Sequence, residues 1–216
     1  MESKSPIKSV SAVISFGPPA GGKSNHNLTI ARWLTSMGHT VHKVSLSSMM
    51  RERGGDIPFV QHIVRDLMAR GGLIPDSLAF ACISYEIIRS LGHHKEIGGD
   101  HTLLIDGFPR TMGQALMLAP LLTQLGCDPV VNVWFHATKS VCAKRYHRDG
   151  REDNGKFPER WADYVGMTVP AYHMFEKIFS GGMVNTQLLQ DVAENHLRQL
   201  LSTFFPALSS PPQHTD

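Results

Sequence analysis

The stretch Gly17-Pro18-Pro19-Ala20-Gly21-Gly22-Lys23-Ser24 decides the fold, because it matches G-x-x-x-x-G-K-[ST] at every fixed position. Before it, residues 10–16 (VSAVISF) form an apolar run typical of a short buried strand. After it, residues 27–37 have the apolar spacing of a helix that ends at Gly38. The sequence therefore predicts a strand, a glycine-rich loop and a helix in direct succession.

A loop of this kind binds phosphate. Its glycines let backbone N–H groups point inward, and the N-terminus of the following helix adds a partial positive charge. We expect Lys23 to reach the β- and γ-phosphates of ATP and Ser24 to ligate Mg²⁺. Because kinases, GTPases and motors share the loop, it does not identify the acceptor of the phosphoryl group. The ATP-binding candidates here are Gly17, Pro18, Pro19, Ala20, Gly21, Gly22, Lys23, Ser24 and Asn25.

Four further strands are predicted downstream, at residues 40–45, 102–105, 130–135 and 183–185, with helical segments between them. The runs at 102–105 and 130–135 lack polar alternation, which is typical of strands covered on both faces of a parallel sheet. We therefore predict a doubly wound α/β fold that binds its ligand at the carboxyl ends of the strands.

Composition excludes several classes of protein. Lys and Arg total 21 and Asp and Glu total 19, a balance that argues against binding to nucleic acid or to acidic membranes. The three cysteines lack C-x-x-C spacing, so neither a disulfide framework nor a zinc site is indicated. The chain starts without a secretory apolar segment and holds no run of membrane-spanning length, so we expect a cytoplasmic protein.

A second motif, Leu103-Leu104-Ile105-Asp106-Gly107-Phe108-Pro109-Arg110, follows the loop in sequence. Asp106 ends an apolar strand, where an unpaired carboxylate is costly, so Mg²⁺ bound directly or through water is its expected partner. The Gly-Phe-Pro turn then brings Arg110 to the same edge of the sheet.

This motif resembles the signature D-G-[FY]-P-R of the adenylate kinase and UMP/CMP kinase family. Parallels run from Val10 to about Leu201. They include Gly72-Leu73-Ile74-Pro75-Asp76, Gly150-Arg151-Glu152-Asp153-Asn154 and Tyr164-Val165-Gly166-Met167-Thr168-Val169-Pro170. The resemblance implies a P-loop kinase with a five-stranded parallel sheet flanked by helices, a helical insert that binds the monophosphate, and a short lid over ATP.

The resemblance also implies the domain organisation. One domain has a core at 10–46, 73–146 and 159–205, with polar tails at 1–9 and 206–216. Residues 47–72 are the monophosphate-binding insert. Residues 147–158 are the lid, which lacks the cysteines of zinc-bearing lids, so no metal beyond Mg²⁺ is expected. A monomer is expected.

Phosphoryl transfer needs aligned nucleotides and positive charge, which the planar fork of arginine supplies well. The resemblance assigns Arg51 and Arg110 to the phosphate of the acceptor. It assigns Arg151 and Arg160 to the group in transfer, where they also face the acceptor. The catalytic candidates are Lys23, Arg110, Arg148, Arg151 and Arg160.

Basic residues before the lid leave two alternatives for stacking on the ATP base. The family has two basic residues four apart here, and Lys144 with Arg148 keeps that spacing. We favour Arg145 instead, because its flat guanidinium stacks better than an ammonium group.

Two segments depart from the family pattern. Ala20 stands where the family has glycine, and we expect it to keep a negative φ while Gly21 takes the strained conformation. In Ser45-Leu46-Ser47-Ser48-Met49-Met50-Arg51 only the ends match the family's S-T-G-D-L-L-R. Two polar groups near the acceptor are therefore missing.

Gln114, four residues after Arg110, indicates which monophosphate is the acceptor. Its amide can pair with the amino group and ring nitrogen of adenine, and adenylate kinases carry glutamine here whereas UMP/CMP kinases usually carry asparagine. The leading hypothesis is transfer of the γ-phosphoryl group of Mg-ATP to AMP, giving two ADP. The alternatives are a kinase for UMP, CMP or another small acceptor, and a catalytically weak nucleotide-binding regulatory protein.

Overall fold

A parallel sheet forms the centre of the computed structural model, which describes residues 9–53, 74–92, 99–148 and 156–206. Within these residues the sheet has five strands in the order β2-β3-β1-β4-β5. They are β1 (Ser9–Phe16), β2 (Thr40–Ser45), β3 (Asp100–Asp106), β4 (Cys127–His136) and β5 (Gly181–Asn185). All five predicted strands are confirmed. Four of them are longer than the apolar runs from which they were predicted.

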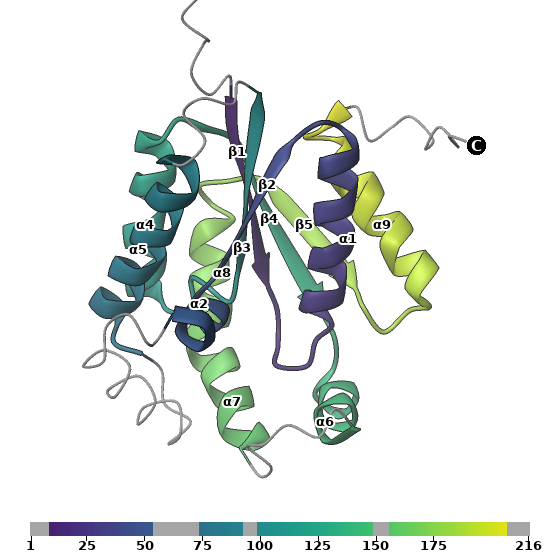
Figure 1. Cartoon of the computed structure of the whole chain (residues 1–216). Helices are drawn as coiled ribbons and strands as arrows, with labels where there is room; N and C mark the ends of the chain where they lie inside the picture. The colour runs from purple at the N-terminus through teal and green to yellow at the C-terminus, as the bar shows by residue number, and fades with distance from the viewer. Residues whose placement is uncertain (1–8, 54–73, 93–98, 149–155, 207–216) are drawn as a thin grey trace, which may run out of the picture.

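Helices cover both faces of this sheet (Figure 1). They are α1 (Lys23–Ser36), α2 (Leu46–Arg53), α4 (Asp76–Gly92), α5 (Met112–Gln124), α6 (Lys139–Arg148), α7 (Phe157–Asp163), the π-helical turn η1 (Tyr164–Thr168), α8 (Val169–Phe175) and α9 (Gln190–Ser202). In Figure 1, α4, α5 and α8 lie on one side and α1 and α9 on the other. The predicted doubly wound α/β fold of a P-loop kinase is confirmed.

The core is divided by the sheet into two apolar clusters. Ile14 of β1 packs in the cluster beneath α4, α5 and α8, whereas its neighbour Val13 packs in the cluster beneath α1 and α9. Both side chains are fully buried. Because successive residues of a strand point to opposite faces, a central strand covered on both sides is mainly apolar, and the buried polar residues Ser11, Ser15 and Asn132 each make a side-chain hydrogen bond. This explains the mainly apolar runs in the sequence.

Helix α1 begins four residues before the predicted start. The sequence prediction began at the first apolar position, but Gly22 with φ 89° already turns the chain into the helix, so the polar residues from Lys23 onward are helical. Of the predicted insert, helix α2 is its first described part, and residues 54–73 lie outside the described residues. The same holds for 149–155 of the predicted lid and for most of both tails. In the described ranges, no helix is both long and apolar enough to cross a bilayer.

The expected backbone of the glycine-rich loop is wrong at two positions, Ala20 and Gly21. Ala20 has φ 55°, and the positive values in the loop fall on Gly17, Ala20 and Gly22, whereas Gly21 keeps an ordinary φ. The methyl group of Ala20 packs against a small apolar cluster that includes Tyr146 and Phe157 of α6 and α7. This packing offsets part of the left-handed strain, so the loop keeps its curvature without a glycine there.

Two features favour glycine at position 17: its φ of 148° and the close approach of neighbouring backbone. A Cβ atom at this position would lie 2.5 Å from the carbonyl oxygen of Phe135 on β4. Gly38 has φ 89° but nothing within 4 Å of such a Cβ, which makes it a matched reference. The loop can therefore leave β1 only if residue 17 lacks a side chain.

We predict that Gly17→Ala destabilises the protein more than Gly38→Ala does. Gly38→Ala should cost about 1–2 kcal/mol, the penalty of a left-handed conformation for a residue with a side chain. Gly17→Ala should add about 1–3 kcal/mol because its Cβ overlaps backbone that cannot move freely. Urea unfolding of both variants measures the difference, and equal losses would contradict the steric account.

Candidate active site

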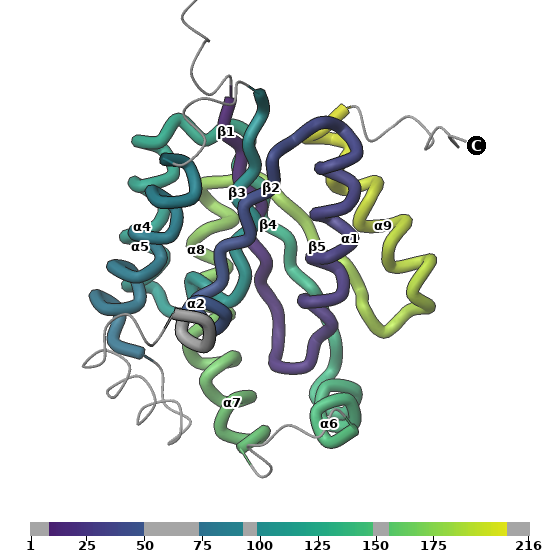
Figure 2. Tube along the Cα trace, in the orientation of Figure 1, coloured from purple at the N-terminus to yellow at the C-terminus, as the bar shows by residue number. Residues whose placement is uncertain are grey.

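The candidate site lies at the carboxyl ends of the strands, as expected for a parallel sheet. Figure 2 shows the loop between β1 and α1 at the same end of the sheet as α6 and α7. In the strand register, Ser15 near the end of β1 pairs with Asp106 at the end of β3 and with Val133 of β4. The glycine-rich loop, the Asp106 motif and the start of α6 therefore converge at one edge.

The side chain of Lys23 folds back onto the glycine-rich loop that precedes it. Its Nζ donates to the carbonyl oxygens of Gly17 and Pro18, each at 2.8 Å. The Gly21 N–H also donates to Pro18 O at 3.1 Å, which closes the loop into a tight turn. The ammonium charge is thus held at the rim of the loop, where phosphate oxygens are expected. Ser24 and Asn25 follow on the first turn of α1, and both are exposed.

Arg145 on α6 lies beside the same loop. Its Nη2 donates to Thr186 O at 2.6 Å, and its Nη1 lies 3.4 Å from Thr186 Oγ1. The Thr186 hydroxyl in turn donates to Gly21 O at 2.8 Å, which ties the loop to the end of β5. The structure therefore brings Arg145 to the loop, whereas the neighbouring Lys144 is exposed.

Thr186 is a site residue that the sequence analysis missed. It is 4 % exposed and follows β5 directly, so its position at the carboxyl end of a strand was the available signal. That signal was weak because β5 is short and a single threonine after it fits no motif.

Arg110 folds back on the turn that delivers it. Its Nε donates to Gly107 O at 2.8 Å, which fixes the direction of the guanidinium. The Arg110 side chain is exposed to solvent on one side, and the protein atoms around the rest of its guanidinium desolvate it and lower its pKa. Asp106 and Asp163 oppose that shift, and Arg160 adds to it. Arginine stays charged throughout, so the site holds two guanidinium groups that repel each other.

Arg160 comes from α7 and lies with its Cζ 6.0 Å from the ring centre of the buried Tyr146 on α6. The ring face stabilises the cation without neutralising it. When two cations are held close together, an anion that binds between them offsets their mutual repulsion. Arg110 and Arg160 lie within electrostatic range of each other, in a site that also holds the carboxylates of Asp106 and Asp163.

Gln114 is buried, with 2 % of its surface exposed. Its Oε1 accepts from the backbone N–H of Arg110 at 2.8 Å, and its Nε2 donates to Asp76 Oδ1 at 3.0 Å. The amide is therefore attached to the Arg110 turn, and Asp76 is a second neighbour of the site that sequence reasoning did not single out. Asp76 lies far from Gln114 in sequence and could not be connected with it by spacing.

Three other predicted arginines are placed less completely. The backbone of Arg51 belongs to α2, but its side chain lies outside the described residues, as does the whole of Arg151. Arg148 is exposed at the last position of α6. The predictions for these three residues therefore stay predictions.

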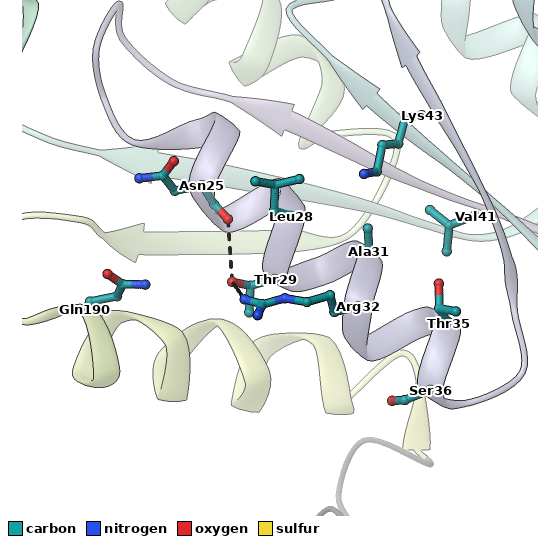
Figure 3. Close-up of a pocket in the computed structure, with 10 residues that line it drawn as sticks. All are labelled: Asn25, Leu28, Thr29, Ala31, Arg32, Thr35, Ser36, Val41, Lys43 and Gln190. Atoms are coloured by element: carbon teal, nitrogen blue, oxygen red, sulfur yellow. Dashed lines mark hydrogen bonds between the residues drawn. The ribbon is translucent and has the colours of Figure 1, made fainter. Parts of the chain in front are cut away.

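An open hollow of about 770 Å³ runs along α1 and is separate from this edge (Figure 3). It shares only Asn25 with the predicted nucleotide site. The figure shows Gln190 of α9 on one side of α1 and Val41 and Lys43 of β2 on the other. The residues that line it are Asn25, Leu28, Thr29, Ala31, Arg32, Thr35, Ser36, Val41, Lys43 and Gln190.

Known proteins resemble this chain over most of its length, although no family model matches it. The adenylate kinase of Hyphomonas neptunium is 30 % identical over 169 residues, covering 76 % of this chain and 83 % of the relative. The adenylate kinase of Thermus thermophilus is 28 % identical over 149 residues, covering 67 % and 71 %. Adenylate kinase 1 of a Synechocystis species is 26 % identical over 188 residues, covering 85 % and 93 %. The chain belongs to the adenylate kinase family.

Proposed function

We propose that this protein transfers the γ-phosphoryl group of Mg-ATP to AMP and forms two ADP in a reversible reaction. The observation that carries the proposal is the convergence of Lys23, Arg145, Arg110 and Arg160 on the carboxyl edge of the sheet, around a phosphate-binding loop. Transfer between two nucleotides requires alignment and positive charge rather than a covalent intermediate. The residues at this edge supply both.

On the ATP side, the loop N–H groups and Lys23 would hold the β- and γ-phosphates. Arg145 is the better candidate for stacking on the ATP base, because Thr186 holds its guanidinium beside the loop. Arg148 and Arg151 are proposed to approach the transferring group from the lid. Their cationic charge would then offset the negative charge that develops on the phosphoryl oxygens.

On the acceptor side, Arg110 and Arg51 would bind the phosphate of AMP, with Arg160 between the acceptor and the transferring group. The exchange is favourable because a phosphate makes stronger, charge-assisted hydrogen bonds than the carbonyl oxygen that Arg110 contacts in the free protein. Closure around the anion also excludes water, which would otherwise accept the phosphoryl group.

Magnesium fits the oxygen donors at this edge. Ser24 presents an exposed hydroxyl at the end of the loop, and Asp106 presents a half-buried carboxylate at the end of β3. Oxygen ligands of this kind suit Mg²⁺, with Asp106 binding directly or through water. When bound, the ion supplies charge neutralisation on the phosphate oxygens of ATP. The proposal also includes a monomeric, cytoplasmic enzyme, which sedimentation and localisation of the full chain would test.

Lys23→Met should reduce kcat at least about a hundredfold, because it removes a positive charge aimed at the phosphates in transfer. Stability should fall by only about 1–2 kcal/mol, the net value of the bonds to Gly17 O and Pro18 O. Lys177→Met is the matched control, because this exposed lysine precedes β5 at the opposite end of the sheet. Steady-state assay and thermal unfolding measure both effects. Near-normal turnover in folded Lys23→Met would refute the loop assignment.

Arg110→Ala should raise KM for the monophosphate by roughly ten- to a hundredfold, which corresponds to about 1.5–3 kcal/mol for a charge-assisted contact. KM for ATP should change little. Arg32→Ala, on the exposed outer face of α1, should leave both constants unchanged. Equal losses for both nucleotides would show that Arg110 does not serve the acceptor.

AMP should be preferred over CMP and UMP by about tenfold or more in kcat/KM, and Gln114→Ala should abolish the preference. Because Gln114 is 2 % exposed, a base can pair with its amide only when neighbouring side chains move apart. Assays with the three monophosphates measure the ratio. Comparable rates would favour a UMP/CMP or broader kinase, and no transfer to any of them would favour a nucleotide-binding regulatory protein.

A further inference from the structure

Asp76, the first residue of α4, connects that helix to the turn that carries Arg110. Its Oδ2 accepts from the Thr111 hydroxyl at 2.8 Å, and its Oδ1 accepts from Gln114 Nε2 at 3.0 Å. Thr111 also caps α5 by accepting from the Gln114 N–H at 3.1 Å. One carboxylate therefore holds both the cap of α5 and the amide of Gln114.

The carboxylate lies against the first turn of α5. A Cβ atom at Gly113 would collide with Asp76 Oδ2, so a side chain at residue 113 would displace the carboxylate from this position. Asp76 is partly exposed, and its hydrogen bonds to Thr111 and Gln114 hold the carboxylate in this position. Its two oxygens are fixed acceptors at one end of the Gln114 amide.

The two partners of Gln114 differ in a way that fixes which way its amide points. The Arg110 N–H can only donate, and it faces Gln114 Oε1 at 2.8 Å. The Asp76 carboxylate can only accept, and it faces Gln114 Nε2. Reversing the amide would place donor against donor and acceptor against acceptor. At 2 % exposure, water cannot compensate for that reversal.

A fixed amide distinguishes two purines of nearly the same shape. An amide has two N–H donors and two acceptor positions, and the two described contacts use one of each. The remaining pair matches adenine, whose amino group donates and whose adjacent ring nitrogen accepts. In hypoxanthine the carbonyl accepts and the ring N–H donates, so its pattern is the reverse. An amide free to turn over would pair with either base.

We propose that Asp76 is a positioning residue that makes the acceptor site select an aminopurine over an oxopurine, through the orientation it imposes on Gln114. The inference rests on the proposed function, because it concerns the acceptor monophosphate of the same site. It predicts discrimination between AMP and inosine monophosphate (IMP), which carry the same phosphate and sugar. Arg110 alone cannot separate them.

The test measures AMP and IMP affinity by calorimetry for the full-length protein and for Asp76→Ala, Asp76→Ser and Asp76→Asn. The unmutated protein should bind AMP about tenfold or more tightly than IMP. Asp76→Ala should lower the ratio by about threefold or more, because only the Arg110 N–H then opposes reversal of the amide, and ATP affinity should be unchanged. Asp76→Ser should do the same, because a hydroxyl both donates and accepts, and it keeps a residue that favours helix starts. Asp76→Asn should retain most of the ratio, because its oxygen can still accept from Gln114.

Ser77→Ala is the matched control, because this exposed neighbour lies on the same helical turn and should leave the ratio unchanged. A merely structural role for Asp76 would weaken AMP and IMP equally and keep their ratio. That result, or equal binding of both nucleotides by the unmutated protein, would overturn the inference. Because the readout is binding, it is independent of turnover. Failure to phosphorylate any monophosphate would refute the proposed function, whereas transfer to AMP with an unchanged ratio in the variants would refute only the role of Asp76.

Discussion

The close approach of Gly17 to the carbonyl oxygen of Phe135 is the constraint on which the rest of the site depends. It lets the chain leave β1 and turn past β4, so that α1 starts at Lys23, after the N-cap residue Gly22, with its first N–H groups facing the loop. On the other side, the Thr186 hydroxyl bonds to Gly21 O and joins the loop to the end of β5. The loop is thus fixed between two strands before any nucleotide binds.

Several Lys and Arg side chains lie at this edge, and in the free protein they donate hydrogen bonds to backbone carbonyl oxygens. Lys23 donates to Gly17 and Pro18, Arg145 to Thr186, and Arg110 to Gly107. Each acceptor is neutral and lies on a loop of the same edge. A phosphate forms stronger bonds to these donors than a carbonyl does, so binding requires exchange of partners rather than assembly of new charges. The free protein is in this sense organised in advance for anions.

The sequence predicted the parts of the fold that follow from local chemistry. The buried strands could be predicted because strands covered on both faces are mainly apolar. The loop and the Asp106 motif could be predicted because their patterns are contiguous in sequence. Contacts between distant segments were not predictable, as the bonds of Asp76 to Thr111 and of Thr186 to Gly21 show. The φ of Ala20 was predicted wrongly because local propensity favours glycine over alanine for a positive φ. The packing of the Ala20 methyl group against α6 and α7, which stabilises this conformation, could not be predicted from the sequence.

Because Leu46 departs from the family pattern, discrimination between acceptor bases would depend more strongly on the Gln114 amide. Leu46 is 8 % exposed and packs in the main apolar cluster, where the resemblance places a threonine. An apolar side chain there offers an acceptor base contact area but no hydrogen bond, so base discrimination rests on fewer polar groups. A single amide discriminates only if it cannot reverse, because its two ends are nearly equal in shape. In this chain the N–H of Arg110 and the carboxylate of Asp76 prevent that reversal. In the proposed reaction, selectivity for the base and placement of Arg110 therefore depend on one hydrogen-bonded turn, which is held by Asp76 of α4 and Gln114 of α5.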